Sequence, residues 1–156
     1  MAHVHALGAL EHNLLVACEG GDVELLQQAC TAHPCLLART RFGIDCDTVA
    51  HVAAFYAQSS VLRLIHKVCP ALLTSSTADG RLPAHEAAAS GSPSTIGLLS
   101  RLGAVDSLFA PGVVMTAAAG GHADVMRAIV AATSGKVDIV DASADGFTSA
   151  HAASCC

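Results

Sequence analysis

The hydrophobic positions of this chain recur at the spacing of helices and not of strands. Apolar residues occupy positions 61, 62, 64, 65 and 68 in one segment and positions 96, 98, 99 and 102 in another. Each set lies on one face of a helix. Pro70 ends the first segment, because the residue before a proline avoids the helical region, and Gly103 ends the second. The pattern predicts an all-α chain of short amphipathic helices.

The predicted helices come in pairs joined by tight polar turns. Gly20-Gly21-Asp22 separates apolar runs at 14–18 and 23–28, and Gly120-Gly121-His122 separates runs at 113–118 and 125–130. The carboxylate of Asp22 is suited to cap the helix that follows it. Two further pairs are expected at 48–68 and 83–102. Ser92-Pro93 starts the second helix of the latter pair, with a serine cap and a proline in the first turn.

A short phrase recurs at the start of the first helix of three of these units. It reads Thr48-Val49-Ala50-His51, Leu82-Pro83-Ala84-His85 and Thr148-Ser149-Ala150-His151. Aligning the units gives equivalent positions, at steps of 36, 34, 30 and 36 residues, at Leu15, His51, His85, Met115 and His151. An internal period of this size predicts stacked units, none of which can bury its apolar face alone.

The recurring phrase resembles the Thr-Pro-Leu-His motif of ankyrin repeats, whose period is about 33 residues. The resemblance covers residues 12–156 and implies an all-α ankyrin-repeat solenoid of stacked antiparallel helix pairs joined by β-turn tips. It would contain about four full repeats and a truncated fifth, preceded by an N-terminal tail at residues 1–11. The second unit departs from the pattern, since Gly43-Ile44-Asp45-Cys46-Asp47 replaces the Asp-Gly turn that begins the third and fifth units.

Composition favours a folded chain whose cysteines are reduced rather than paired in disulfides. Of the 156 residues, 53% are hydrophobic and 13% are charged, which argues against disorder. The formal net charge is −5 and no basic run occurs, so neither a nucleic-acid partner nor an anionic membrane surface is expected. The seven cysteines are odd in number and contain no Cys-x-x-Cys, which argues against a disulfide framework or a zinc knuckle. With no signal peptide or transmembrane segment in the pattern, we expect a cytoplasmic or nuclear protein.

The recurring histidines do not predict a metal or catalytic site. Equivalent atoms of neighbouring units lie roughly 10 Å apart, too far for a single metal whose ligands lie at about 2 Å. In ankyrin repeats this histidine is structural and ties the turn to the helix, so the resemblance implies the same here. His3 near the amino terminus and Cys155-Cys156 at the other end are read as incidental. We expect no enzymatic activity, no cofactor and no metal.

A binding surface is the remaining candidate. By the resemblance, partners would contact the concave side, through the turn tips and the outward residues of each first helix. Phe55 and Tyr56 are the only adjacent aromatics, and aromatic residues are enriched in interface hot spots. The acidic tips favour a partner with some basic character. The predicted partner-binding residues are Asp45, Asp47, Phe55, Tyr56, Asp79, Arg81, Ser90, Phe109, Asp145 and Phe147.

The expected function is therefore protein–protein interaction without catalysis, with the identity of the partner left open. One alternative is a recognition fragment of a larger multidomain enzyme or effector, because the sequence stops inside a repeat. Another is a self-associating structural module, joined through the uncapped C-terminal face.

Overall fold

The computed structural model describes residues 2–33 and 36–134, and these residues fold as helices joined by turns and loops. They form no strand, and the only β-type pairing among them is an isolated antiparallel bridge between Phe42 and Asp47. The predicted all-α class is therefore confirmed for this part of the chain. The α-helices are α1 (Ala2–Gly20), α2 (Val23–Ala32), α3 (Leu36–Arg39), α4 (Val49–Phe55), α5 (Ser59–Val68), α6 (Pro83–Ala89), α7 (Pro93–Leu99), α8 (Val113–Ala119) and α9 (Ala123–Ala132). Three short turns of helix complete the order, namely η1 (Pro70–Thr74), η2 (Ser100–Ala104) and η3 (Val105–Phe109).

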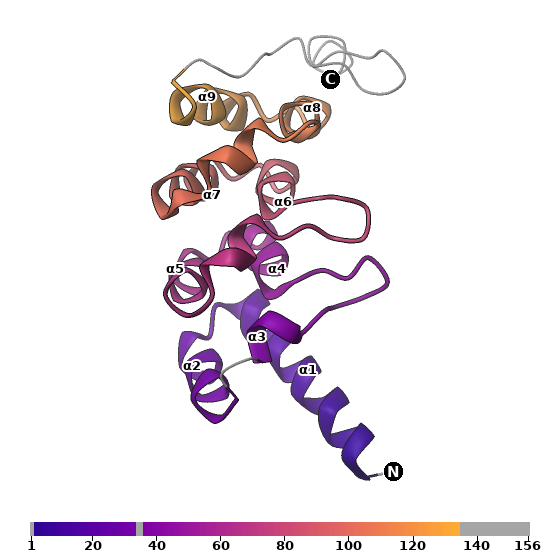
Figure 1. The fold of residues 1–156 in the computed structure, drawn as a ribbon. Coiled ribbons are helices and arrows are strands. Elements are labelled where there is room, and N and C mark those ends of the chain that lie inside the picture. The colour runs from indigo at the N-terminus through magenta and orange to yellow at the C-terminus, as the bar shows by residue number, and fades with distance from the viewer. Residues whose placement is uncertain (1, 34–35, 135–156) are drawn as a thin grey trace.

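The helices stack as pairs in a row with two layers (Figure 1). One layer consists of α1, α4, α6 and α8, each in contact with the next, and the other consists of α2, α5, α7 and α9, likewise in contact along the row. Two long loops, at 40–48 and 75–82, extend to the side of the first layer (Figure 1). The structure thus has a loop side, where α1, α4, α6 and α8 lie next to these loops, and an opposite side formed by α2, α5, α7 and α9.

Two of the second helices, α2 and α7, begin at the capping residues that the sequence predicts. Asp22 accepts a hydrogen bond from the amide of Leu25 at 3.0 Å, and Ser92 accepts one from the amide of Thr95 at 3.4 Å. Both are N-cap contacts, which satisfy amides that a helix leaves without an internal partner. Pro93 occupies the first turn of α7, where its missing amide costs nothing.

The turn between the two helices of each pair repeats one backbone conformation. Gly21, Ala57, Gly91 and Gly121 all have positive φ, at 76°, 56°, 71° and 69°. They are separated by the same steps as the aligned histidine positions. Glycine adopts this conformation without strain, whereas Ala57 carries a Cβ into it. The second unit therefore makes the same turn with a less suitable residue.

The tip of the second unit, which lacks the Asp-Gly pair, also places a positive-φ residue where the third unit has a glycine. Cys46 has a φ of 60° at the position that Gly80 occupies in the third unit, where φ is 78°. The bridge between Phe42 and Asp47 closes the base of this tip, with amide–carbonyl distances of 2.8 and 3.0 Å in the two directions. The loop at 40–48 is thus a defined turn despite lacking the Asp-Gly pair.

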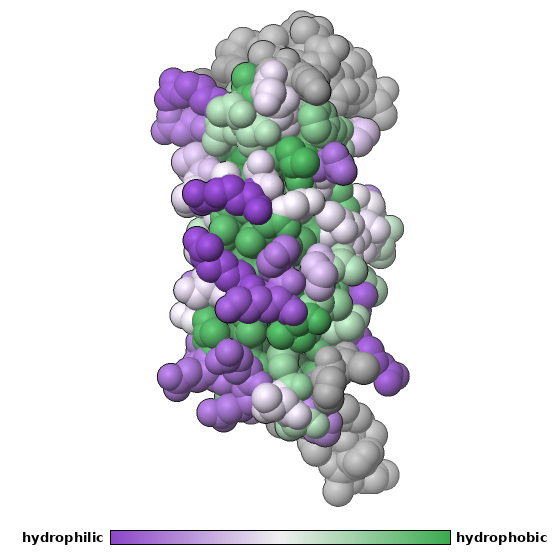
Figure 2. Space-filling model, turned by 60° about the vertical axis from the view of Figure 1, so that its left-hand side comes forward, coloured by the Kyte–Doolittle hydropathy of each residue, from purple (hydrophilic) through white to green (hydrophobic). Residues whose placement is uncertain are grey.

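The core runs through the whole row and is built from aliphatic side chains. Leu62, Ile65, Ile96, Leu99 and Ile129 are fully buried between the layers. The alanine pairs at 53–54, 87–88 and 117–118 are buried in the first layer, where small side chains allow close helix approach. Figure 2 brings the second layer forward and shows apolar side chains flanked by hydrophilic ones along its length. Each unit therefore buries its apolar face against its neighbours.

Two parts of the expected domain plan differ from the structure or lie beyond it. Residues 2–11, expected as a tail, are part of α1, which runs unbroken from Ala2 to Gly20. The reason is local, because this segment is rich in alanine and leucine and contains no proline. The predicted truncated fifth unit, with His151, falls at residues 135–156 and lies outside the described residues.

Candidate functional site

The two described histidines of the recurring phrase link neighbouring units through their rings. The Nδ1 atom of His51 accepts from the amide of Thr48 at 3.2 Å, which leaves Nε2 to donate to the carbonyl oxygen of Arg81 at 3.0 Å. His85 does the same, with Nδ1 accepting from the amide of Leu82 and Nε2 donating to the carbonyl of Pro111, both at 3.0 Å. Each ring therefore joins the start of its own helix to the loop of the next unit.

These bonds require the neutral imidazole, because Nδ1 must accept while Nε2 donates. Burial lowers the pKa of His51, which keeps its ring neutral near physiological pH. The ring is only 1% exposed, and both nitrogen atoms are used within the fold. Among the described residues no group of three or more His, Cys, Asp or Glu side chains could hold a metal ion. The histidines therefore position the loops of the next unit, and the residues of a candidate binding site must be sought among other side chains.

The loop that follows η1 is fixed to both of its neighbours. Arg81 carries the carbonyl that His51 binds, and its guanidinium forms an ion pair with Glu86 of α6 at 2.9 Å. The amide of Ala78 donates to the carbonyl of Asp45, which ties the two loop tips together at 3.1 Å. The loops that carry the predicted residues Asp45, Asp47, Asp79 and Arg81 are therefore adjacent and mutually held.

The predicted aromatic pair lies at the end of α4. Phe55 and Tyr56 are 45% and 48% exposed, so neither ring belongs to the core. Their ring centroids are 5.3 Å apart in an edge-on arrangement, a favourable geometry for two aromatic rings. Large exposed aromatic side chains of this kind are typical of interfaces.

A cavity of about 380 Å³ opens beside this pair. It lies within the size range of small-molecule and side-chain pockets, about 300–1,000 Å³. Its walls come from the end of α1, the tip at 42–47, α4 and α6, which belong to three successive units. The lining residues are Leu15, Glu19, Phe42, Gly43, Asp47, His51, Val52, Phe55, Tyr56 and Glu86.

The lining of this cavity is acidic. Glu19, Asp47 and Glu86 contribute carboxylates, and no lysine or arginine lines it. Burial raises the pKa of Glu86, the nearby Arg81 guanidinium opposes that rise, and the charges of Asp47 and Asp45 add to it. Because the lining carries carboxylates and no lysine or arginine, the cavity presents a negative potential to anything that enters it.

The structure brings together only some of the predicted partner-binding residues. Asp47, Phe55 and Tyr56 line the cavity, and Arg81 reaches its edge through Glu86. Asp45 and Asp79 are exposed on the adjoining tips. These residues form one continuous candidate surface on the loop side.

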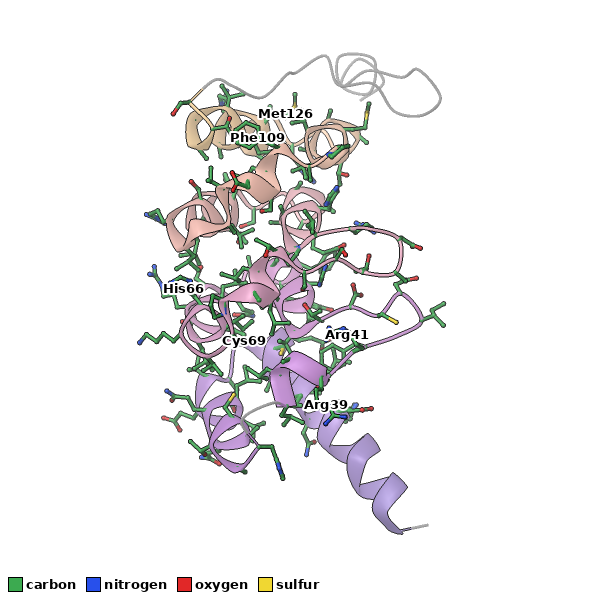
Figure 3. The ribbon with its side chains drawn as sticks, in the orientation of Figure 1. Arg39, Arg41, His66, Cys69, Phe109 and Met126 are labelled. Atoms are coloured by element: carbon green, nitrogen blue, oxygen red, sulfur yellow. The ribbon has the colours of Figure 1, made fainter. Side chains whose placement is uncertain are left out.

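The other predicted residues lie elsewhere. Ser90 is half-buried at the end of α6, and its hydroxyl donates to the carbonyl of Ala87. Phe109 is exposed in η3, towards the α8–α9 end of the row and apart from Arg41 (Figure 3). Asp145 and Phe147 lie outside the described residues, so their prediction, like that of self-association through the C-terminal face, stays a prediction.

Several lining residues were not predicted from the sequence. Glu86 occupies the position equivalent to Val52, one unit later, and both side chains line the cavity. This unit alignment could have pointed to Glu86. Phe42 and Glu19 gave no such signal, because they reach the cavity only through the bridge at 42–47 and the contact of α1 with α4.

No protein-family model matches the chain, and no curated protein is similar to it. Within residues 2–33 and 36–134, no single helix has the length and apolar character needed to cross a membrane. One pair passes by length and composition when taken together, from Pro93–Phe109 and Val113–Ala119, but it is bent by 97°.

Proposed function

We propose that this chain is an ankyrin-type repeat array that binds a partner protein through its loop side, without catalysis of its own. The exposed Phe55–Tyr56 pair beside an open cavity carries this proposal, because solvent-exposed aromatic rings grouped at a concave site are typical of interface anchors.

The arrangement of the histidines supports the ankyrin-type assignment. His51 and His85 each tie the start of a first helix to the following loop, as the resemblance implies for this position. The equivalent positive-φ turns at Gly21, Ala57 and Gly91 add a second repeated feature that is independent of the histidines. Repeat arrays of this kind use extended concave surfaces for binding.

The two loop tips are already ordered before any partner binds. The tips at 42–47 and 77–81 are held by the bridge to Asp47, the Ala78–Asp45 bond and the Arg81–Glu86 pair. A surface that is already ordered loses little conformational entropy when a partner binds. The loop side is therefore preorganised.

Affinity capture combined with cross-linking tests this function. The full chain would be compared with a Phe55→Ala/Tyr56→Ala variant and with a control, Arg63→Ala/His66→Ala, that changes exposed residues of α5 on the other layer. We expect the aromatic variant to lose its cross-linked partners and the control to keep them. Equal recovery of every partner by the aromatic variant would refute the loop-side assignment.

A further inference from the structure

The cavity beside α4 combines aromatic rings with carboxylates. Phe42, Phe55 and Tyr56 supply the rings, and Glu19, Asp47 and Glu86 supply carboxylates to its lining. An aromatic ring attracts a cation to its face within about 6 Å of the centroid. Carboxylates attract the same cation by charge, so both kinds of lining select for one class of occupant.

The imidazole of His51, which also lines the wall, does not change this preference. Its Nε2 donates to the carbonyl of Arg81 and its Nδ1 accepts from Thr48, so it offers the cavity neither a free donor nor a charge. With a neutral imidazole and no lysine or arginine in the lining, the charged groups of the wall are all acidic.

Glu86 is the group that an entering cation would help most. Its side chain is only 14% exposed and, among the residues that the structure describes, it forms an ion pair with Arg81, whose side chain is 47% exposed. Asp45 and Asp47 lie close enough to disfavour its charged form. A half-buried carboxylate beside other carboxylates gains from a second cation on its cavity side.

We propose that this cavity binds a basic side chain of a partner polypeptide, and that it takes arginine in preference to lysine. The proposal rests on the protein-binding function above and names the chemistry of the partner. The guanidinium is planar, stacks on aromatic rings and binds carboxylates through a fork of donors, whereas the lysine ammonium is a compact and strongly hydrated charge. The net charge of −5 also favours approach of a basic segment.

Short peptides test the cavity independently of any natural partner. The full chain, labelled for NMR, is titrated with acetyl-Gly-Ser-Arg-Ser-Gly-amide and with the same peptide carrying citrulline or lysine in place of arginine. Citrulline keeps the shape of arginine and removes its charge. We expect saturable shifts at α4 and at 42–47, and binding of the citrulline peptide weaker by at least about tenfold, since charge-assisted hydrogen bonds are lost. Equal binding of the citrulline peptide would overturn the proposal, and equal binding of the lysine peptide would overturn the preference for arginine.

Three variants separate a binding effect from a folding defect. Glu86→Gln should weaken the arginine peptide about tenfold, and the control Glu24→Gln, an exposed carboxylate on α2, should leave it unchanged. Arg81→Met should strengthen binding, because it removes the cation that competes for Glu86 while leaving the backbone carbonyl that His51 binds. A damaged fold cannot produce tighter binding, so weaker or unchanged binding by Arg81→Met would count against the site.

The two proposals fail separately. If the arginine peptide does not bind but the Phe55→Ala/Tyr56→Ala variant still loses its cross-linked partners, the loop side binds a protein without using the cavity for a basic side chain. If the peptide binds but the variant keeps every partner, the basic-side-chain site stands and the assignment of partner binding to the loop side is wrong.

Discussion

Replacing His51 tests the inter-unit link on which the loop side depends. His51→Ala removes the acceptor of the Thr48 amide and the donor to the Arg81 carbonyl in one change. Each hydrogen bond contributes about 0.5–1.5 kcal/mol, and leaving the buried Thr48 amide without a partner costs about 1–3 kcal/mol. We expect the free energy of unfolding to fall by about 2–4 kcal/mol, a large share of the roughly 5–15 kcal/mol of a typical domain.

Urea unfolding followed by circular dichroism measures this loss. A matched variant, His51→Asn, retains a short acceptor for the Thr48 amide and cannot reach the Arg81 carbonyl, so it should lose less than the alanine variant. The difference between the two variants isolates the local bond. A free energy of unfolding for His51→Ala within about 0.5 kcal/mol of the wild type, the range of an ordinary surface change, would refute the structural role.

The same variant has a defined dependence on pH. Burial lowers the pKa of His51 in the folded chain below the value of 6.5 that applies when it is unfolded. The unfolded chain then binds more protons as the pH falls, so the contribution of His51 is complete above pH 6.5 and is lost as the pH falls towards its folded pKa. The stability difference between wild type and His51→Ala should therefore shrink below pH 6.5. A difference that grows on acidification would contradict the neutral, doubly bonded ring.

The remaining predictions concern the repeated turns and the thiols. Ala57→Gly should raise the free energy of unfolding by about 1 kcal/mol, measured by urea titration, because it relieves a positive φ. Gly91→Ala should lower the free energy of unfolding by about 2 kcal/mol, because an alanine at this positive φ is strained and its Cβ would lie 2.7 Å from the His122 ring. Gly97→Ala in α7, where an added Cβ meets nothing within 4 Å, should instead raise it by about 0.5–1 kcal/mol. Iodoacetamide at about pH 8 should modify the exposed Cys46 and spare Cys18, whose pKa burial raises to about 12, as peptide mass spectrometry would show; equal modification of the folded chain would mean that Cys18 is not buried.

Much of the fold could be predicted because its signals are local. The Asp22 and Ser92 caps and the prolines at 70 and 93 act on their own neighbours in sequence, so the helix pairs are visible in the pattern. The predicted tail at residues 1–11 differs from the structure, in which α1 runs from Ala2 to Gly20, because the helix propensity of alanine and leucine favours a helix here.

The candidate site was only partly predictable, because it is assembled from three units. Tyr56 could be named because aromatic residues are enriched in interface hot spots, and Asp47 from its place at a turn tip, and both line the cavity. Phe42 and Glu19 line it beside residues of α4 and α6, and α1, which carries Glu19, packs on α4. No local pattern encodes contacts that join residues so far apart in sequence.

The contacts that hold the units together also shape the surface proposed to bind. His51 bonds the Thr48 amide through Nδ1 and the Arg81 carbonyl through Nε2. The second bond fixes the loop that carries the Arg81 guanidinium. That guanidinium is thereby held beside Glu86, and one face of the cavity acquires a carboxylate that is only partly neutralised. Without its bond to His51 the loop no longer holds the Arg81 guanidinium beside Glu86, so His51→Asn should lower the stability and strengthen binding of a basic side chain, as expected for Arg81→Met. Loss of stability with unchanged peptide binding would mean that the loop is held in place by its other contacts, namely the Ala78–Asp45 bond and the ion pair itself.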